Sequence, residues 1–291
     1  MFVYHDPSCA EYAVPGHPDA PFRVLKTAEL LREKHPDWMA DAGKPVAPAD
    51  DAALLLAHTP AHLARLRGQE EGMFDADTAA LPGMDAYARR GAGAAAAVAG
   101  WAMEGTKAFS LMRPPGHHAT ADQIMGFCYL NSVAVAALHA REVRGGRRVA
   151  VWDFDAHHGN GTEAILMGSE GLLYSSVHQY PGYPGTGTEH VGNARNYPVA
   201  PGTPAAEHLR ALEASWADVL AFGPDLVLVS AGFDAYAGDP LTDMRLRPKE
   251  FAALGQWLRE APCPVGAILE GGYSQELPVL VNTFLEAWEG E

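Results

Sequence analysis

One stretch of the sequence predicts both a buried strand and a cluster of reactive side chains: Val149-Ala150-Val151-Trp152-Asp153-Phe154-Asp155-Ala156-His157-His158-Gly159-Asn160-Gly161. Its first four residues are apolar and include two valines, which is typical of a buried strand in a parallel sheet. Two carboxylates and two imidazoles follow within six residues, and a Gly-Asn-Gly break comes next. We therefore expect a strand whose carboxyl end carries polar chemistry.

The spacing of these polar residues is compatible with a metal site. Side chains alternate along a strand, so Asp153, Asp155 and His157 share one face if the extended conformation continues. An Asp and a His on one face can bind the same cation, and this mixture of ligands suits zinc or another divalent first-row metal better than calcium. Taken alone, the stretch fits a surface turn with a hydrogen-bonded histidine pair equally well. The rest of the chain favours the metal.

The composition is that of an ordinary globular protein. With 291 residues, 48% of them hydrophobic and 20% charged, the chain can form one large α/β domain or two small ones. It has no linker, internal repeat or low-complexity tract beyond an alanine-rich run, so we expect one domain over residues 1–291. Cys9, Cys128 and Cys263 are far apart and odd in number, which predicts neither a disulfide framework nor a cysteine metal cluster.

The charge and the ends of the chain bear on partners and location. A net charge of −15 disfavours a nucleic-acid surface and would suit a cationic substrate, although solubility is the commoner reason for such a charge. The first residues lack the pattern of a signal peptide, and no apolar segment is long enough to span a membrane. We expect a cytoplasmic protein with no nucleic-acid or membrane partner. The oligomeric state is not predicted.

Strand, polar loop and helix alternate along the chain, which is the pattern of an α/β fold with a mostly parallel sheet. Strands are expected at residues 2–4, 46–47, 108–111, 149–152, 172–178, 226–230 and 265–269. Helices are expected at about residues 19–35, with Asp19 as the N-cap, and 58–66, 84–104, 131–141, 205–222, 248–260 and 277–288. Residues 68–83 lack periodicity, which predicts a long loop of the kind that is functional or mobile.

Polar side chains follow five of the predicted strands. In an open parallel sheet, ligands bind outside the carboxyl ends of the strands, so these five loops are expected to meet. They carry His117-His118, Asp155-His157, Ser176-Val177-His178, Asp234 and Tyr273. Five such loops after five apolar strands are difficult to attribute to chance.

The chemistry of these residues describes metal-assisted hydrolysis of an amide. Asp155, His157 and Asp234 make three ligands, which leaves positions open on a metal that acidifies its water to about pH 7 and polarises a carbonyl. A histidine of the 117/118 pair would act as general base and then as acid to the leaving amine. Tyr273 would donate its hydroxyl to the developing oxyanion.

Plainer interpretations of these residues stay open. Asp234 can cap a turn, and Tyr273 can serve only in packing. Asp153 can be a buried structural carboxylate, although we favour a role in orienting a histidine or another ion. The residues alone do not fix the native metal, since two aspartates and a histidine accept several divalent cations.

The residues resemble the zinc-dependent histone deacetylases and their bacterial amidohydrolase relatives. The resemblance extends over nearly the whole chain, with matching order and spacing at residues 113–118, 126–131, 153–161, 184–187, 232–234, 238–240 and 270–273. It implies the arginase/deacetylase α/β fold, a single catalytic domain with a mostly parallel sheet of about eight strands flanked by helices. The His-His-Gly-Asn-Gly-Thr sequence is the class II-like form, and class IIa members replace the tyrosine that is Tyr273 here. Retention of this tyrosine implies robust deacetylase activity.

The resemblance also implies roles for individual residues. One catalytic Zn²⁺ is implied on three ligands: Asp155, His157 and Asp234. The implied catalytic residues are His117, His118 and Tyr273, with His118 as the proton donor to the leaving amine. A structural K⁺ is implied, partly through backbone carbonyls, at Asp153, Asp155, His157, Ser176 and Val177, with Asn160 grouped with these supporting residues. An acyl-lysine tunnel is implied between the aromatics Phe127 and Tyr183, with Gly126, Gly271 and Leu241 as further substrate contacts.

Three features bear on the substrate. Tyr183 stands where the family has phenylalanine, which narrows or polarises the tunnel mouth, and the loop at residues 179–183 is shorter than is common. Polyamine-directed relatives of the eukaryotic type carry an acidic gate directly after Gly-Asp-Pro, whereas this chain has Leu241. The 291 residues also leave little room for the dimer-forming insertion of bacterial polyamine enzymes. We expect deacylation of an acyl-lysine protein or peptide, or of a lysine-like amine, with acetylpolyamine deacetylation as the alternative.

Two further functions, ureohydrolase activity and binding of acyl-lysine without turnover, fit the sequence less well. A ureohydrolase with two manganese ions shares the fold, but it needs additional carboxylate ligands where this chain has a tandem histidine. A binder that holds acyl-lysine without turnover would be expected to lack the tyrosine or a ligand, and none is missing.

Overall fold

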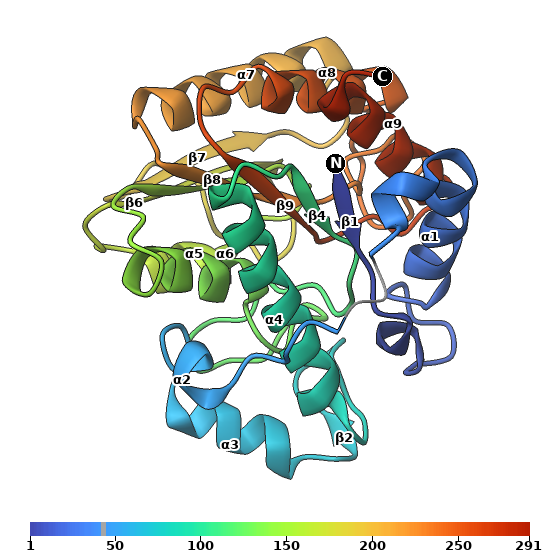
Figure 1. The fold of residues 1–291 in the computed structure, drawn as a ribbon, viewed down its shortest axis with the longest axis vertical. Helices are drawn as coiled ribbons and strands as arrows, with labels where there is room; N and C mark the ends of the chain where they lie inside the picture. Colours follow the sequence, from blue (N-terminus) through green and yellow to red (C-terminus); the bar gives the residue numbers. More distant parts are fainter. Residues whose placement is uncertain (42–44) are drawn as a thin grey trace.

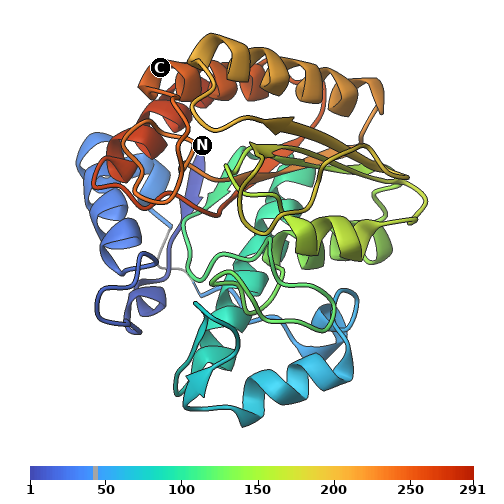
Figure 2. The same ribbon diagram turned by 180° about the vertical axis from the view of Figure 1, so that it is seen from behind.

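The computed structural model describes residues 1–41 and 45–291. Its main sheet has seven strands, all parallel, in the order β1-β4-β9-β8-β5-β6-β7 (Figures 1 and 2). These strands are β1 (Phe2–Tyr4), β4 (Ala108–Ser110), β5 (Val149–Asp153), β6 (Leu172–Gln179), β7 (Ala194–Val199), β8 (Leu226–Ala231) and β9 (Val265–Leu269). A separate antiparallel hairpin consists of β2 (Gly72–Met73) and β3 (Ala79–Ala80).

Helices cover both faces of the main sheet (Figures 1 and 2). One face is covered by α1 (Phe22–Lys34), α7 (Ala205–Ala221), α8 (Pro248–Arg259) and α9 (Leu277–Glu289). The other is covered by α4 (Met84–Met103), α5 (Ser132–Glu142) and α6 (Asn160–Leu166), with α2 (Asp51–Leu54) and α3 (Pro60–Gly68) packed beyond α4. Two short 3₁₀ helices, η1 (Pro7–Ala10) and η2 (Pro36–Met39), flank α1.

The alternation of strand side chains divides the core into two layers. In β5, Ala150 and Trp152 pack into the layer that contains α7 and α9, whereas Val149 and Val151 pack into the layer that contains α4 and α5. Every residue of β5 is buried. A strand that is covered on both faces has a continuous run of apolar residues rather than an alternating pattern. This run is the reason why β5 can be predicted from the sequence.

The strand order places a topological switch point beside β5. After β5 the chain runs outward through β6 and β7, and it then returns to β8 on the other side of β5 and continues to β9. A crevice forms outside the carboxyl ends of parallel strands at such a point. The loops that follow β5 and β8 are therefore neighbours, although 78 residues separate Ala156 from Asp234, whose carboxylate accepts the amide hydrogen of Ala156.

The predicted α/β class with a parallel sheet is confirmed, but the sheet has seven strands where about eight were expected. The strand predicted at residues 46–47 is wrong. The amide of Val46 donates to the hydroxyl of Tyr4 rather than to a strand, at 3.3 Å. The carbonyl of Ala47 lies so close to Gly93 of α4 that an added Cβ would approach it to 2.2 Å. This segment packs against a helix rather than joining the sheet.

The sequence analysis missed α2, the two short 3₁₀ helices, β7, the β2–β3 hairpin and α6, and the last three show how weak the sequence signal can be. β7 is an edge strand that contains Pro198, and proline is tolerated there because an edge strand can spare one N–H. The hairpin within residues 68–83 has only two residues in each strand. α6 begins at the Gly-Asn-Gly sequence that predicted a break.

The helix start predicted at Asp19 is also wrong. α1 begins at Phe22, after Pro21. The carboxylate of Asp19 instead forms buried ion pairs with Arg23, at 2.7 Å, and with Arg113, at 2.9 Å. Among the described residues, no helix combines the length and apolar character that crossing a membrane requires.

Candidate metal and catalytic site

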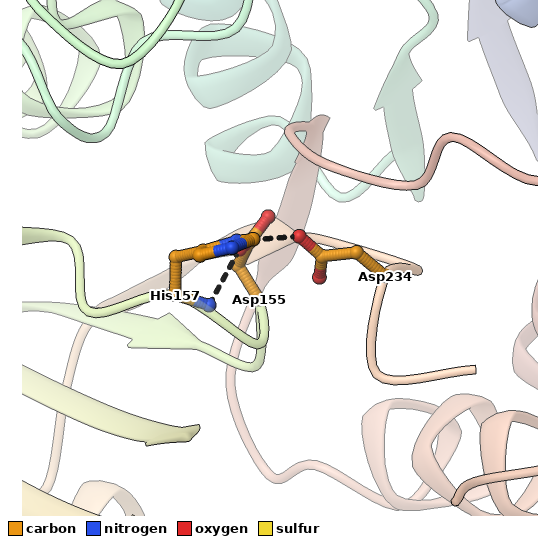
Figure 3. A group of neighbouring side chains, drawn as sticks. All are labelled: Asp155, His157 and Asp234. Atoms are coloured by element: carbon orange, nitrogen blue, oxygen red, sulfur yellow. Dashed lines mark hydrogen bonds and ion pairs between the residues drawn. The ribbon is translucent and has the colours of Figure 1, made fainter. Parts of the chain in front are cut away.

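The three predicted metal ligands lie together at the carboxyl ends of β5 and β8 (Figure 3). One ligand atom from each of Asp155, His157 and Asp234 lies within 4.8 Å of the other two. Nδ1 of His157 is 2.8 Å from an oxygen of Asp234 and 3.2 Å from an oxygen of Asp155. The switch point of the sheet thus joins one imidazole nitrogen and two carboxylate oxygens around a single point.

The electrostatics of this group favour a cation at its centre. Asp155 and Asp234 are fully buried. Burial and the charge of Asp155 raise the pKa of Asp234 to about 7. Burial opposes a charge on His157, yet Asp234 and Asp155 together raise its pKa well above the ordinary value. A proton on His157 therefore supplies the positive charge that a divalent cation would supply between the two carboxylates. This donor set fits zinc or a similar first-row ion.

Backbone amides and glycines fix the two carboxylates. Asp155 accepts hydrogen bonds from the amides of His157, at 2.9 Å, and Gly271, at 2.7 Å. A Cβ at Gly271 would stand 2.4 Å from Asp234 and 2.5 Å from Asp155, and one at Gly232 would stand 2.1 Å from Asp155. Only glycine fits at these two positions, because the backbone passes directly against the carboxylates. Gly271 thus lies against the candidate ligands, and its contact with a substrate stays a prediction.

The tandem histidines have different partners. His117 Nδ1 lies 3.1 Å from Asp153, whose carboxylate also accepts from the hydroxyl of Tyr174 at 3.0 Å. His118 Nδ1 lies 2.8 Å from the side-chain oxygen of Asn160. Asp153 therefore contacts a histidine, as the favoured orienting role requires, and that role stays a prediction. Asn160 contacts the second histidine directly.

These different surroundings shift the pKa values of the two imidazoles in opposite directions. Burial alone would lower the pKa of His117, but the charges of Asp155 and Asp153 raise it to about 10. Burial, together with the neighbouring His117 and His157, holds the pKa of His118 well below its ordinary value. Because an amide oxygen accepts the hydrogen on its Nδ1, a neutral His118 presents Nε2 as a proton acceptor.

The residues predicted to hold K⁺ lie at the end of β5, in the loop that follows it, and within the second half of β6. Asp153 pairs in register with Ser176, which is followed by Val177. The amide of Asp155 donates to the side chain of Asp153 at 3.1 Å, and the hydroxyl of Ser176 lies 2.9 Å from Nδ1 of His178. The structure brings these residues together, and their binding of an ion stays a prediction.

A cavity of about 210 Å³ leads from the surface to this group. It is lined by Asp77, His118, Gly126, Phe127, His157, Tyr183, Leu241 and Tyr273. The ring of Tyr183 meets His118 edge-on at 5.0 Å, and the ring of Phe127 meets Tyr273 edge-on at 5.8 Å. The predicted substrate residues, Gly271 apart, therefore surround one opening.

The sequence did not single out Asp77, which also lines the cavity. It lies in the long loop at residues 68–83, whose length and lack of periodicity were the available signal. Burial and the adjacent Asp75 raise the pKa of its carboxyl. An acidic group thus stands in the wall of the pocket.

The backbone around Tyr273 is held by side chains that the sequence analysis also missed. The amide of Tyr273 donates to Asp239 at 2.7 Å. Arg23, fully buried, donates to the carbonyls of Gly272, at 2.6 Å, and of Glu270, and its guanidinium lies 4.7 Å from the centre of the tyrosine ring. Loss of hydration raises the pKa of Tyr273 well above its ordinary value, so the hydroxyl keeps its proton and can donate it in a hydrogen bond.

Glu270 connects this segment to the tandem histidines. Its buried carboxylate accepts from the amide of Gly116 at 2.6 Å and from that of His117 at 3.1 Å. The loop after β9 is therefore bonded directly to the loop after β4. The ends of the central strands form one connected site rather than separate loops.

Comparison with known proteins agrees with this geometry. Residues 17–287 match the family model described as histone deacetylase domain. The chain is 36% identical over 311 residues to a probable deacetylase of Methanothermobacter thermautotrophicus, covering 100% of this chain and 91% of that protein. It is 36% identical over 193 residues to acetylpolyamine amidohydrolase 2 of Pseudomonas aeruginosa, covering 62% and 56%. The solved HDA15 HD domain superposes with a TM-score of 0.92 at 31% identity, covering 100% of this chain and 91% of the other.

The chain therefore belongs to the histone deacetylase family. Membership supports a deacetylase or amidohydrolase activity and an acylated amine as substrate. It also agrees with the α/β fold and with a possible metal group of two aspartates and a histidine.

Proposed function

We propose that residues 1–291 form one zinc-dependent catalytic domain that removes acetyl or longer acyl groups from lysine or lysine-like amines. The observation that supports this most directly is the meeting of Asp155, His157 and Asp234 at a pocket that His118 and Tyr273 also line. A ligand set, a candidate base and a candidate oxyanion donor thus share one opening. This is the minimum that metal-assisted amide hydrolysis requires.

Each part of the site has a definable task in this proposal. A zinc ion on Asp155, His157 and Asp234 would supply Lewis acidity, lowering the pKa of a coordinated water and polarising the amide carbonyl. His118, neutral and bonded through Nδ1 to Asn160, accepts a proton from the attacking water and returns it to the leaving amine. The protonated hydroxyl of Tyr273 donates a hydrogen bond to the carbonyl oxygen as negative charge develops there.

His117 has a supporting role in the same proposal. Asp153 orients its ring, and the charges of Asp155 and Asp153 raise its pKa. A positive charge on His117 opposes protonation of the adjacent His118, whose ring centre is 4.1 Å away. We propose in addition that K⁺ occupies the group of Asp153, Asp155, His157, Ser176 and Val177, where its charge would offset the buried carboxylates.

The pocket wall suits an alkyl chain that ends in an amide. Phe127 and Tyr183 present aromatic rings, and Leu241, 38% exposed, places an apolar side chain at the opening. Asp77 adds one carboxylate, which can accept a peptide N–H or attract an ammonium group. We therefore favour acyl-lysine in a protein or peptide, with an acetylpolyamine as the alternative that Asp77, the charge of −15 and the polyamine-acting relative support.

A substrate panel tests this preference. The zinc-loaded protein is assayed on acetyl-lysine peptides, on longer acyl-lysines, and on acetylated putrescine, cadaverine and spermidine. We expect the highest kcat/KM on a peptide. Asp77→Asn keeps an acceptor oxygen, so it should change kcat/KM for the peptide by no more than about threefold. For a cationic substrate, the same change should lower kcat/KM roughly tenfold and make kcat/KM depend less on salt concentration.

The opposite outcomes identify the alternatives. A preference for acetylpolyamines that falls in Asp77→Asn would show that the acidic wall, rather than Leu241, determines the substrate. Hydrolysis of a guanidino group with a requirement for manganese would indicate a ureohydrolase. Tight binding of acetyl-lysine without any turnover would indicate a binding module.

A further inference from the structure

The pocket wall contains a strained segment at Gly126 and Phe127. Both residues have positive φ angles, 59° and 67°. Within residues 1–41 and 45–291, Phe127 is the one non-glycine residue with a positive φ. A bulky L-residue persists in the left-handed region only where its surroundings hold it there. The segment also lies against His118, since a Cβ at Gly126 would stand 2.6 Å from the ring of that histidine.

Two side chains from the β2–β3 turn hold this segment. Oδ2 of Asp75 accepts the amide hydrogen of Gly126 at 3.2 Å, and Oγ1 of Thr78 accepts that of Phe127 at 2.9 Å. The two consecutive amides are thus each paired with an acceptor about fifty residues earlier in the chain, at separations of 51 and 49 residues. Thr78 is fully buried, so water does not replace its hydroxyl.

The turn is itself organised before it meets the pocket wall. Oδ1 of Asp75 accepts the amide hydrogens of Asp77, at 3.1 Å, and Thr78, at 2.7 Å. The amide of Phe74 donates to the carbonyl of Thr78 at 2.8 Å, which closes the turn. The hydroxyl of Thr78 donates in turn to the side chain of Asp77 at 3.2 Å. One hydroxyl therefore links two pocket-lining residues, Phe127 and Asp77.

We propose that Thr78 is a positioning residue that sets the acyl-chain preference of the pocket by holding Phe127 in its left-handed conformation. Without Oγ1 the partly buried amide of Phe127 would lose this acceptor, and the strained segment would relax. The Phe127 ring would then leave its place beside Tyr273 in the pocket wall, and the wall would accept a longer acyl chain. The expected change in acyl-chain preference rests on the proposed deacylase function. The hydrogen bond by which Thr78 holds Phe127 does not depend on that function.

The test compares Thr78→Val, which removes the hydroxyl at nearly constant shape, with Thr78→Ser, which retains it. Two quantities are measured on the full, zinc-loaded chain: hydrogen–deuterium exchange of a peptide containing Gly126 and Phe127, and kcat/KM for acetyl-lysine and hexanoyl-lysine peptides. In Thr78→Val we expect faster exchange at this peptide. The acetyl-to-hexanoyl ratio of kcat/KM should fall by roughly five- to tenfold, mainly through KM for acetyl-lysine, the size expected for one lost hydrogen bond. Thr78→Ser should remain near wild type in both.

Two outcomes would overturn the inference. One is unchanged exchange at the Gly126–Phe127 peptide together with an unchanged acyl preference in Thr78→Val. The other is an equal loss of activity on both substrates with a lowered melting temperature, which would make the turn a support of the fold alone. If the wild type hydrolyses no acyl-lysine, the proposed function fails, and the exchange comparison still decides whether Thr78 holds the pocket wall.

Discussion

Replacing Asp234 by alanine is expected to abolish both metal binding and turnover. The substitution removes one of three ligand atoms that lie within 4.8 Å of one another and leaves Asp155 and His157 to hold a cation alone. We expect a loss of more than about 100-fold in metal affinity and in kcat/KM, since the loss of a residue that merely orients a ligand already costs 10- to 100-fold. Zinc per chain, measured after dialysis against a weak chelator, and deacetylation rate report the two effects.

A matched control separates ligand loss from general damage. Asp243 lies on the same loop after β8 but its side chain is exposed, so Asp243→Ala should keep both zinc and activity. Asp234 also accepts the amide hydrogen of Ala156, so Asp234→Asn, which retains an acceptor oxygen, tests whether the fold survives. Full zinc occupancy in Asp234→Ala would refute the ligand assignment.

Tyr273→Phe should lower kcat by roughly two to three orders of magnitude, the usual cost of removing one oxyanion donor. The ring contacts with Phe127 and Arg23 remain possible in this variant, so the zinc content and the fold should be unchanged. Because the hydrogen bond strengthens as charge develops, kcat and kcat/KM should fall together while KM changes little.

The control for this prediction is a tyrosine on the same loop as Tyr183 that has no assigned role in the reaction. Tyr180 is 37% exposed, and Tyr180→Phe should behave as wild type. If Tyr273→Phe turns over at the wild-type rate with its metal intact, the tyrosine has no part in the mechanism, and another donor must stabilise the oxyanion.

The sequence was sufficient for the parts of the fold that depend on local pattern. β5, β8 and β9 are short apolar runs followed by polar residues, and parallel strands deliver such residues to one edge. The clustering of Asp155, His157 and Asp234 is what that rule predicts from the sequence. The rule requires that the loops lie side by side. The strand order meets this requirement, because β5 and β8 are neighbours in the sheet and the loops that follow them are adjacent.

The missed elements depend on partners that are distant in sequence. Pro198 made β7 look unlike a strand, and only its place at the edge of the sheet makes it tolerable. Arg23 donates a hydrogen bond to the carbonyl of Gly272, 249 residues away. Thr78 accepts one from the amide of Phe127, 49 residues away. No local periodicity encodes such pairings. For the same reason Asp19 suggested a helix cap, because its arginine partners were not apparent from the neighbouring residues.

The most direct test of the account is the release of acetate from an acetyl-lysine peptide by metal-free protein as zinc is added back. We predict negligible turnover without metal, a rise that saturates at one zinc per chain, and no such rise in Asp234→Ala. Turnover that survives verified removal of all metal would contradict the account, because the chemistry assigned to Asp155, His157 and Asp234 would then be unnecessary.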